Sequence, residues 1–205
     1  SEPYQKRISH GMVLAEDGKK MSKSLGNVVN PDDVIKEYGA DTMRMYEMFM
    51  GPFAEAIPWD TKGIVGVRRF LDKVNSLSDK VKKNIKSDEH LIHKTIKKVT
   101  EDINEFRFNT AVSALMIMVN EMHNQKEVGQ EVYDKFLVLL SPFAPHLTEE
   151  IWEKFGNKAS IHLQPWPEYD PELAKENEIE FVIQINGKVK DKCVMPADVS
   201  EEDVL

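Results

Sequence analysis

The sequence predicts a mainly α-helical protein built around an antiparallel helical bundle, with a small α/β unit beginning near its C-terminal end. Two observations lead to this fold class. Through most of the 205 residues, apolar residues recur at spacings of three and four, in segments separated by short polar, Gly or Pro links. After about residue 178 the period changes to two, as in a β-strand, and Asn186-Gly187 supplies a strong hairpin signal.

A short strand and a short helix are expected on either side of a polar loop in the first forty residues. The apolar stretch Met12-Val13-Leu14 suits the end of a strand. After the loop, Asn30 is a suitable N-cap and Pro31 is favourable in the first helical turn. Gly39 can end this helix just after Tyr38.

A second helix is expected immediately afterwards, with Asp41 as its N-cap. Its predicted apolar face consists of Met43, Tyr46, Phe49 and Met50. Core packing is a sufficient role for these methionines.

Four or five amphipathic helices are then expected to form the bundle. The first begins at its cap Asp60 and carries one apolar stripe as far as Ile85, interrupted only by Ser78. The next ones are expected from Ser87-Asp88 to Phe106, from Asn109-Thr110 to Met122, from Gln130 to Leu140, and from Thr148 to a stop at Gly156. The helix over 109–122 is apolar on more than one side, which predicts a central position.

The rest of the chain predicts less regular structure and then a hairpin. Residues 160–170 resemble an extended strap over the bundle, and residues 172–178 form an acidic linker. Alternating apolar residues predict strands over 179–185 and 189–194, and a further helix is expected to begin at Ser200. Because the chain begins with Ser and stops just inside this helix, we expect it to be a piece of a longer protein.

Composition indicates an ordinary soluble protein, with 41% apolar and 30% charged residues and no apolar run long enough to cross a bilayer. The single cysteine and six scattered histidines give no pattern for a disulfide framework or a metal site. The net charge is −8, but residues 61–107 carry 12 Lys and Arg against 7 Asp and Glu. A locally positive face is therefore possible in an acidic chain.

The loop over residues 16–27 has the composition of a phosphate-binding loop. Lys20 and Lys23 lie among small hydroxyl residues and glycines, without apolar periodicity, just before a helix. Lysine ammonium groups, serine hydroxyls and backbone N–H groups can all bind phosphate oxygens. Similar compositions are common in plain surface loops, so the order of the residues has to decide between the two interpretations.

Lys20 to Ser24 reads KMSKS and resembles the signature loop of the class I aminoacyl-tRNA synthetases, including the Gly26-Asn27 that follows it. The flanking residues resemble bacterial-type leucyl-tRNA synthetases in particular. This likeness is carried by residues 30–35, 38–44, 48–52, 58–59, 66–71, 141–146 and 184–189. It therefore covers nearly the whole chain.

The resemblance implies a division into three parts and a role in leucine–tRNA ligation. The parts are the end of a Rossmann-type catalytic domain with the KMSKS loop (1–57), a helical bundle of the anticodon-binding type with its strap and linker (58–177), and the truncated start of an α/β tRNA-binding domain (178–205). ATP is the implied substrate, with Mg²⁺ accompanying it and no metal site in this chain. The implied ATP-binding residues are Lys20, Met21, Ser22, Lys23 and Ser24, with Lys20 and Lys23 as catalytic groups.

The bundle is implied to dock along tRNA. Its candidate phosphate contacts are Lys80, Lys82, Lys83, Lys86, Lys94, Lys97, Lys98 and Arg107, and the terminal domain adds Lys188 and Lys190. For any one of these residues, a role as a solvated surface charge is the alternative.

The implied partners are tRNA(Leu), ATP and leucine, in a cytoplasmic protein that is monomeric at full length and has no membrane contact. The N-terminal half of such an active site and the editing domain are not in this chain, so the chain alone is not expected to aminoacylate tRNA. The alternative hypothesis is a stand-alone helical RNA-binding or protein-interaction module that retains the loop.

Overall fold

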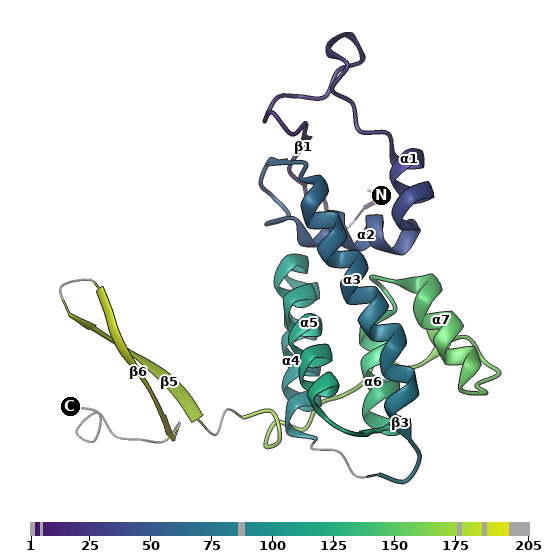
Figure 1. The fold of residues 1–205 in the computed structure, drawn as a ribbon, viewed down its shortest axis with the longest axis vertical. Coiled ribbons are helices and arrows are strands. Elements are labelled where there is room, and N and C mark those ends of the chain that lie inside the picture. Colours follow the sequence, from purple (N-terminus) through teal and green to yellow (C-terminus); the bar gives the residue numbers. More distant parts are fainter. Residues whose placement is uncertain (1–2, 5, 86–88, 176–177, 186–187, 197–205) are drawn as a thin grey trace.

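The computed structural model is mostly helical, which confirms the predicted fold class (Figure 1). It describes residues 3–4, 6–85, 89–175, 178–185 and 188–196, with the backbone alone for the last two ranges. Figure 1 shows long helices lying side by side in a bundle, with a loop and two shorter helices at one end of it.

Seven α-helices occur in these described ranges. They are α1 (Pro31–Tyr38), α2 (Ala40–Phe49), α3 (Thr61–Leu77), α4 (His90–Asn104), α5 (Phe108–Asn124), α6 (Gln130–Leu140) and α7 (Pro145–Lys154). The strands pair as β1 (Val13–Leu14) with β2 (Ile57–Pro58) in parallel, β3 (Val81–Lys82) with β4 (Val128–Gly129) in parallel, and β5 (Glu178–Ile185) with β6 (Lys188–Pro196) in antiparallel. The hairpin formed by β5 and β6 confirms the prediction from the change of period. The predicted turn at 186–187 and the helix from Ser200 lie outside the described residues.

Two helix starts follow from local capping, as predicted. The Asn30 side chain accepts a hydrogen bond from the backbone N–H of Asp32 at 3.2 Å, with Pro31 in the first turn of α1. The Asp60 carboxylate accepts from the backbone N–H of Lys62 at 2.9 Å at the start of α3. In both cases a side chain satisfies a backbone donor that the helix itself leaves unpaired.

The predicted cap of α2 is wrong. Gly39 takes that position, and Asp41 lies inside the first turn with its side chain buried. Its carboxylate accepts from the backbone N–H groups of Leu147 at 2.7 Å and His146 at 3.4 Å, and its Oδ1 lies 2.7 Å from His146 Nδ1. Asp41 therefore caps α7, a helix more than a hundred residues later, and ties α2 to the bundle.

Helix α3 is shorter than its apolar stripe predicted. It ends at Leu77, and a 3₁₀ turn (Ser78–Lys80) leads into β3. The Ser78 hydroxyl donates to the carbonyl of Asn75 at 2.6 Å, so it competes for the backbone acceptors of the last turn. The Lys80 ammonium then donates to the carbonyls of His123 at 2.6 Å and Gln125 at 3.2 Å, which holds this turn against the end of α5.

Three other predicted boundaries shift by a few residues. Helix α4 ends at Asn104, and Phe106 follows it with a φ of 59°, so Phe106 is not on the helix as predicted. Helix α5 begins at Phe108, one residue early. Helix α7 begins at Pro145 rather than Thr148, whose hydroxyl donates to the carbonyl of Ala144 inside the helix at 2.9 Å.

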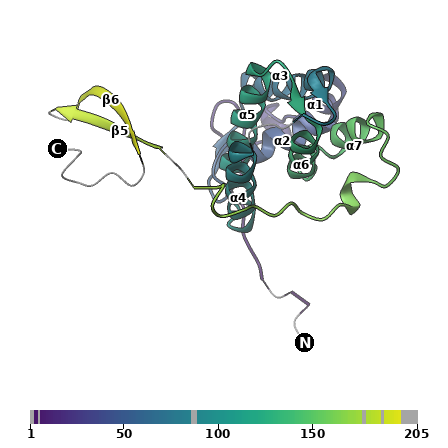
Figure 2. The same cartoon turned by 90° about the horizontal axis from the view of Figure 1, so that it is seen from below.

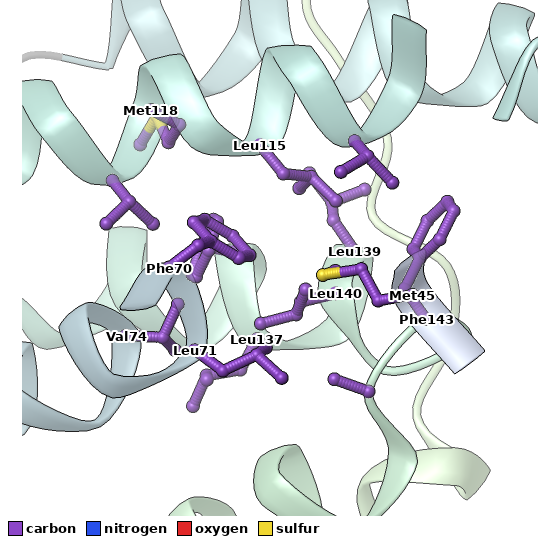
Figure 3. Close-up of a cluster of buried hydrophobic side chains, with 14 of the residues drawn as sticks. Met45, Phe70, Leu71, Val74, Leu115, Met118, Leu137, Leu139, Leu140 and Phe143 are labelled. Carbon is purple, nitrogen blue, oxygen red and sulfur yellow. The ribbon is translucent and has the colours of Figure 1, made fainter. Parts of the chain in front are cut away.

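The core is one continuous cluster to which α5 contributes one face. The predicted central position of α5 is not confirmed, because Ile117 in the middle of the helix is 58% exposed. Figure 3 shows side chains from α2, α3, α5, α6 and the turn after α6 meeting in this cluster. The labelled members are Met45, Phe70, Leu71, Val74, Leu115, Met118, Leu137, Leu139, Leu140 and Phe143. Burial of this apolar surface is the main favourable term that holds the helices together.

The predicted strap is confirmed by its contacts with the bundle. After α7 the chain runs along the outside of the helices toward α4 (Figure 2). Trp166 Nε1 donates to the Thr100 hydroxyl at 2.8 Å, and the backbone N–H of Asp170 donates to His93 Nδ1 at 2.9 Å. Both Thr100 and His93 are on α4, so the strap covers one side of that helix.

One carboxyl in the bundle is poorly solvated. Asp134 Oδ1, on α6, is buried without a hydrogen-bond partner within the described ranges, and Oδ2 accepts only a long bond from Gln130 at 3.4 Å. Burial is the largest influence and raises the pKa of Asp134 to about 6; the Gln130 hydrogen bond opposes the rise, Glu131 adds to it and Lys83 reduces it.

Asp134→Asn is expected to change the free energy of unfolding by about 1 kcal/mol more in the stabilising direction at pH 8 than at pH 4. The folded-state pKa lies above the unfolded value, so the stability that this carboxyl contributes is complete below about pH 4 and is lost as the pH rises through 6. Urea unfolding at both pH values measures the difference. An identical effect of the substitution at the two pH values would contradict the assignment, and Glu150→Gln, on the surface of α7, is the matched control.

Candidate functional site

The loop over residues 16–27, called the lysine loop from here on, leaves β1 through a tight turn. The backbone N–H of Ala15 donates to the carbonyl of Lys19 at 2.8 Å, and the N–H of Gly18 donates to the carbonyl of Ala15 at 2.9 Å. A short 3₁₀ helix follows over Lys23–Leu25 and ends at Gly26, whose φ of 65° favours glycine. The loop is therefore an ordered connection between β1 and α1.

Asn27 braces this loop from within. Its side-chain oxygen accepts from the backbone N–H of Ser22 at 2.8 Å, and its side-chain nitrogen lies 3.4 Å from the carbonyl of Lys20. The hydroxyls of Ser22 and Ser24 lie 2.8 Å apart. These contacts hold the backbone on both sides of Met21, which is half-buried and packs against the core.

The two predicted catalytic lysines differ from their neighbour. Lys20 and Lys23 are exposed, and within the described ranges neither ammonium makes a hydrogen bond or an ion pair. Lys19, in contrast, lies 3.6 Å from the Asp17 carboxylate. The loop thus presents two uncompensated cations on a braced backbone, an arrangement that can bind a polyphosphate.

The base of the loop is anchored to the start of α3. The Thr61 hydroxyl donates to Glu16 at 2.7 Å and accepts from Trp59 Nε1 at 3.2 Å. Trp59 also donates its backbone N–H to the carbonyl of Leu14 and meets the Tyr46 ring edge-on at 5.0 Å. These contacts fix the base of the loop to the bundle.

An aromatic cluster joins the segment after α2 to the turn between α4 and α5. Phe53 lies 5.4 Å from Phe106 and 5.6 Å from Phe108, measured between ring centres, and His10 lies 6.0 Å from Phe53. The carbonyl of Phe53 also accepts from the backbone N–H of Gly11 at 2.7 Å, just before β1. Sequence analysis did not detect this cluster, because its members come from three distant segments.

The candidate tRNA contacts near the end of α3 fall into different environments. Lys82 and Lys83 are exposed at the end of the bundle far from the lysine loop. Lys80 is half-buried with its ammonium bound to two carbonyls, so the structure gives it a local role. Lys86 lies outside the described residues, and of Lys188 and Lys190 only the backbone, in β6, is described.

The candidates on α4 are brought together with Arg107. Lys94, Lys97 and Lys98 are exposed on consecutive turns, and Lys98 Nζ lies 2.7 Å from Asp102 Oδ2. Arg107 Nε lies 2.8 Å from Asp102 Oδ1. One carboxylate therefore fixes two of the predicted phosphate contacts.

Asp102 is the residue that sequence analysis missed. Its side chain is fully buried and also accepts from the Thr110 hydroxyl at 2.7 Å. Burial by itself raises the pKa of Asp102, but hydrogen bonds from Lys98, Thr110 and Arg107 outweigh it and hold the pKa below its usual value. The spacing of four residues between Lys98 and Asp102 indicates an ion pair on one face of a helix. It does not show that the Asp102 side chain is buried.

In the described part of the chain, no group of three or more His, Cys, Asp or Glu side chains could hold a metal ion. No α-helix among those described has the length and apolar character needed to cross a membrane.

Two protein families match the sequence. Residues 1–60 match the class I tRNA synthetases of the I, L, M and V group, and residues 89–205 match the anticodon-binding domain of tRNA ligase. The first match contains the lysine loop, and the second covers α4 to α7 and the hairpin.

Two solved structures have a similar fold. The LeuRS of Agrobacterium radiobacter K84 (agnB2), in a ternary complex with tRNA and LeuAMS, superimposes with a TM-score of 0.78 at 31% identity, over 99% of this chain and 29% of that chain. Methionyl-tRNA synthetase of Mycobacterium tuberculosis, in complex with methionyl-adenylate, superimposes with a TM-score of 0.53 at 19% identity, over 73% of this chain and 38% of that chain. The second likeness concerns the fold alone.

The chain thus spans less than a third of the length of the LeuRS that it matches. The family matches follow one another along the sequence in the order in which the loop and the helical bundle occur. The chain therefore belongs to the class I tRNA synthetases that carry an anticodon-binding domain, and it corresponds to a C-terminal portion of a leucyl-tRNA synthetase.

Proposed function

We propose that this chain works as part of a leucine–tRNA ligase, which joins leucine to ATP as leucyl-adenylate and then transfers the leucyl group to tRNA(Leu). The main support is the lysine loop, whose two exposed ammonium groups have no counter-charge in the described part of the chain. The likeness to LeuRS at 31% identity supports leucine as the amino acid. The alternative of a stand-alone RNA-binding module is not favoured, because residues 1–60 match the catalytic family.

In the proposed reaction, the leucine carboxylate attacks the α-phosphate of ATP and pyrophosphate leaves. Negative charge grows on the leaving group, so cations that bind it more tightly in the transition state accelerate the step. Lys23 would contact the phosphates and Lys20 would assist, with Met21, Ser22 and Ser24 forming the rest of the loop. Mg²⁺ would accompany the phosphates of ATP.

The bundle would dock along tRNA through its lysines. The described candidates with exposed side chains are Lys82, Lys83, Lys94, Lys97 and Lys98, and Arg107 is half-buried beside them. Each phosphate contact releases counterions, so binding should weaken steeply as salt is added. Lys80, Lys86, Lys188 and Lys190 stay predictions of the same kind.

The division of the chain at residues 57 and 177 is part of the proposal, with the catalytic end first, the bundle next and the tRNA-binding α/β domain last. We also propose a cytoplasmic protein, monomeric at full length. Because the catalytic partner half is expected outside these residues, the 205-residue chain should not aminoacylate tRNA by itself.

Amino-acid-dependent exchange of pyrophosphate into ATP tests the proposal. The chain would be joined to the upstream part of a leucyl-type synthetase and assayed with leucine, isoleucine, valine and methionine. Leucine is expected to support the fastest exchange. A faster rate with another of the four amino acids would contradict leucine specificity but not the family membership. Leucyl-tRNA formation by the 205 residues alone would contradict the proposal that the chain needs an upstream catalytic half.

A further inference from the structure

The lysine loop runs directly into α1, so a contact that fixes α1 also fixes the C-terminal side of the loop (Figure 1). Only two residues separate Asn27, which braces the loop, from Asn30, which caps α1. The Asn30 side chain also donates to the Asp33 carboxylate at 3.1 Å. The loop and α1 are therefore joined by a short segment with side-chain hydrogen bonds at both of its ends.

Helix α2, which follows α1, is firmly attached to the bundle. The Asp41 carboxylate accepts from the backbone N–H of Leu147 at 2.7 Å at the start of α7. Arg44 donates from both Nε and Nη2 to the carbonyl of Pro142, each at 3.1 Å. Met45 of the same helix is fully buried in the core. Helix α2 is thus a fixed base from which α1 extends.

Helix α1 has fewer attachments. It contains no buried residue, and it meets α2 at Gly39, whose φ of 93° favours glycine. Val34 and Tyr38 are half-buried and pack against the core. Among the described residues, one side-chain hydrogen bond joins α1 to the bundle, from Arg68 Nη1 on α3 to the carbonyl of Tyr38 at 3.0 Å.

The geometry of Arg68 suits it to hold this end of α1. Its Nε donates to the Asp72 carboxylate one turn later on α3, at 3.1 Å, which orients the guanidinium. The Tyr38 carbonyl is in the last turn of α1, where carbonyls lack helical partners and the helix dipole favours a cation. One planar side chain therefore binds α3 and the end of α1 together.

We propose that Arg68 is a positioning residue for the lysine loop. By holding the end of α1 to α3, it fixes the direction of the helix that carries Asn27, and Asn27 holds the backbone at Ser22. Reaction rates are sensitive to such placement, because an error of about 1 Å can cost roughly a hundredfold. This inference rests on the proposed role of Lys20 and Lys23 in adenylate formation and adds a residue outside the loop.

Hydrogen exchange of the 205-residue chain tests the attachment of α1 directly. Arg68→Met keeps an aliphatic stem and removes the donor, at a side chain that is 51% exposed. The backbone amides of α1 and of Ser22 are expected to exchange about tenfold faster, and those of α4 to α7 at an unchanged rate. An unchanged rate of hydrogen exchange in α1 would overturn the proposal.

Arg69→Met is the matched control for hydrogen exchange and for activity. Arg69 is the next residue of α3, it is exposed, and in the described part of the chain it makes no hydrogen bond or ion pair. Its replacement removes the same charge from the same helix. The hydrogen exchange of α1 should therefore stay as in the wild type.

Pyrophosphate exchange in an enzyme completed with its upstream half separates positioning from a purely structural role. Arg68→Met is expected to lower kcat about tenfold and to leave KM for leucine unchanged, since the loop is proposed to act on the phosphates. Arg68→Lys, which keeps a donor of similar reach, should recover most of the loss. Arg69→Met should stay within about twofold of the wild type.

Faster hydrogen exchange of α1 with an unchanged kcat would mean that Arg68 only stabilises α1, and would overturn its positioning role while leaving the proposed function in place. Equal losses of kcat in Arg68→Met and Arg69→Met would assign the effect to charge alone, and the positioning role would again be wrong. A completed wild-type enzyme without leucine-dependent pyrophosphate exchange would contradict the proposed function, and this inference with it.

Discussion

Lys20→Ala combined with Lys23→Ala is expected to slow adenylate formation about a thousandfold in an enzyme completed with its upstream half. The two ammonium groups are exposed and uncompensated within the described ranges, so alanine removes the positive charge that stabilises departing pyrophosphate. The loss should appear mainly in kcat and less in KM for ATP, because the interaction strengthens in the transition state. Pyrophosphate exchange and single-turnover adenylate formation measure it.

Lys19→Ala is the matched control for this prediction. Lys19 has the same side chain in the same loop, but it lies beside Asp17 at 3.6 Å and outside the KMSKS sequence. Its removal should change the rate less than threefold, since an exposed and already paired charge contributes little. A loss for Lys19→Ala as large as that for Lys20→Ala or Lys23→Ala alone would show that only the total charge of the loop matters.

The features that could be predicted from the sequence depend on neighbouring residues. Asn30 and Asp60 cap their helices through backbone groups two residues away, so the sequence alone contains the whole interaction. The limits of α6 at Gln130 and Leu140 follow similarly from local period and the proline at 142. The lysine loop was predicted from the order of five residues, and its position between β1 and α1 agrees with that prediction.

The features that could not be predicted depend on contacts between distant segments. Asp41 has the position of a local cap, yet it caps α7, because the folded bundle brings those backbone donors to it. Lys80 was predicted as a phosphate contact from charge alone, and only the fold shows that two carbonyls of the α5 end bind it. No periodicity in one helix reveals such partners.

The candidate RNA surface illustrates the same limit. The apolar period of α5 predicts a central helix, but it does not show that Ile117 faces a groove instead of the core. Likewise, the positive charge of residues 61–107 was evident in the sequence, whereas its division between exposed lysines and those bound to Asp102 was not. Exposure is a property of the packed helices, so it becomes visible only in the structure.

Asp102→Ala is expected to lower the free energy of unfolding by about 2–3 kcal/mol at pH 7. The fully buried carboxylate accepts from Lys98, Arg107 and Thr110, so its loss leaves a cavity and frees the turn between α4 and α5. Lys98 and Arg107 are about half exposed and can be rehydrated, which keeps the loss at this moderate value. Urea unfolding followed by circular dichroism measures it.

The effect of Asp102→Ala should also depend on pH in a defined direction. The folded-state pKa of Asp102 is lowered, so its stabilisation is complete above the unfolded value of about 3.9 and is lost as the pH falls through the lower folded value. The difference between wild type and variant is therefore constant from pH 5 to 8 and shrinks only in strong acid. Asp72→Ala is the control, because Asp72 makes an i,i+4 pair with Arg68 at 3.1 Å on the surface and should contribute less than about 0.5 kcal/mol. Equal losses for the two variants would mean that burial adds nothing to the Asp102 contacts.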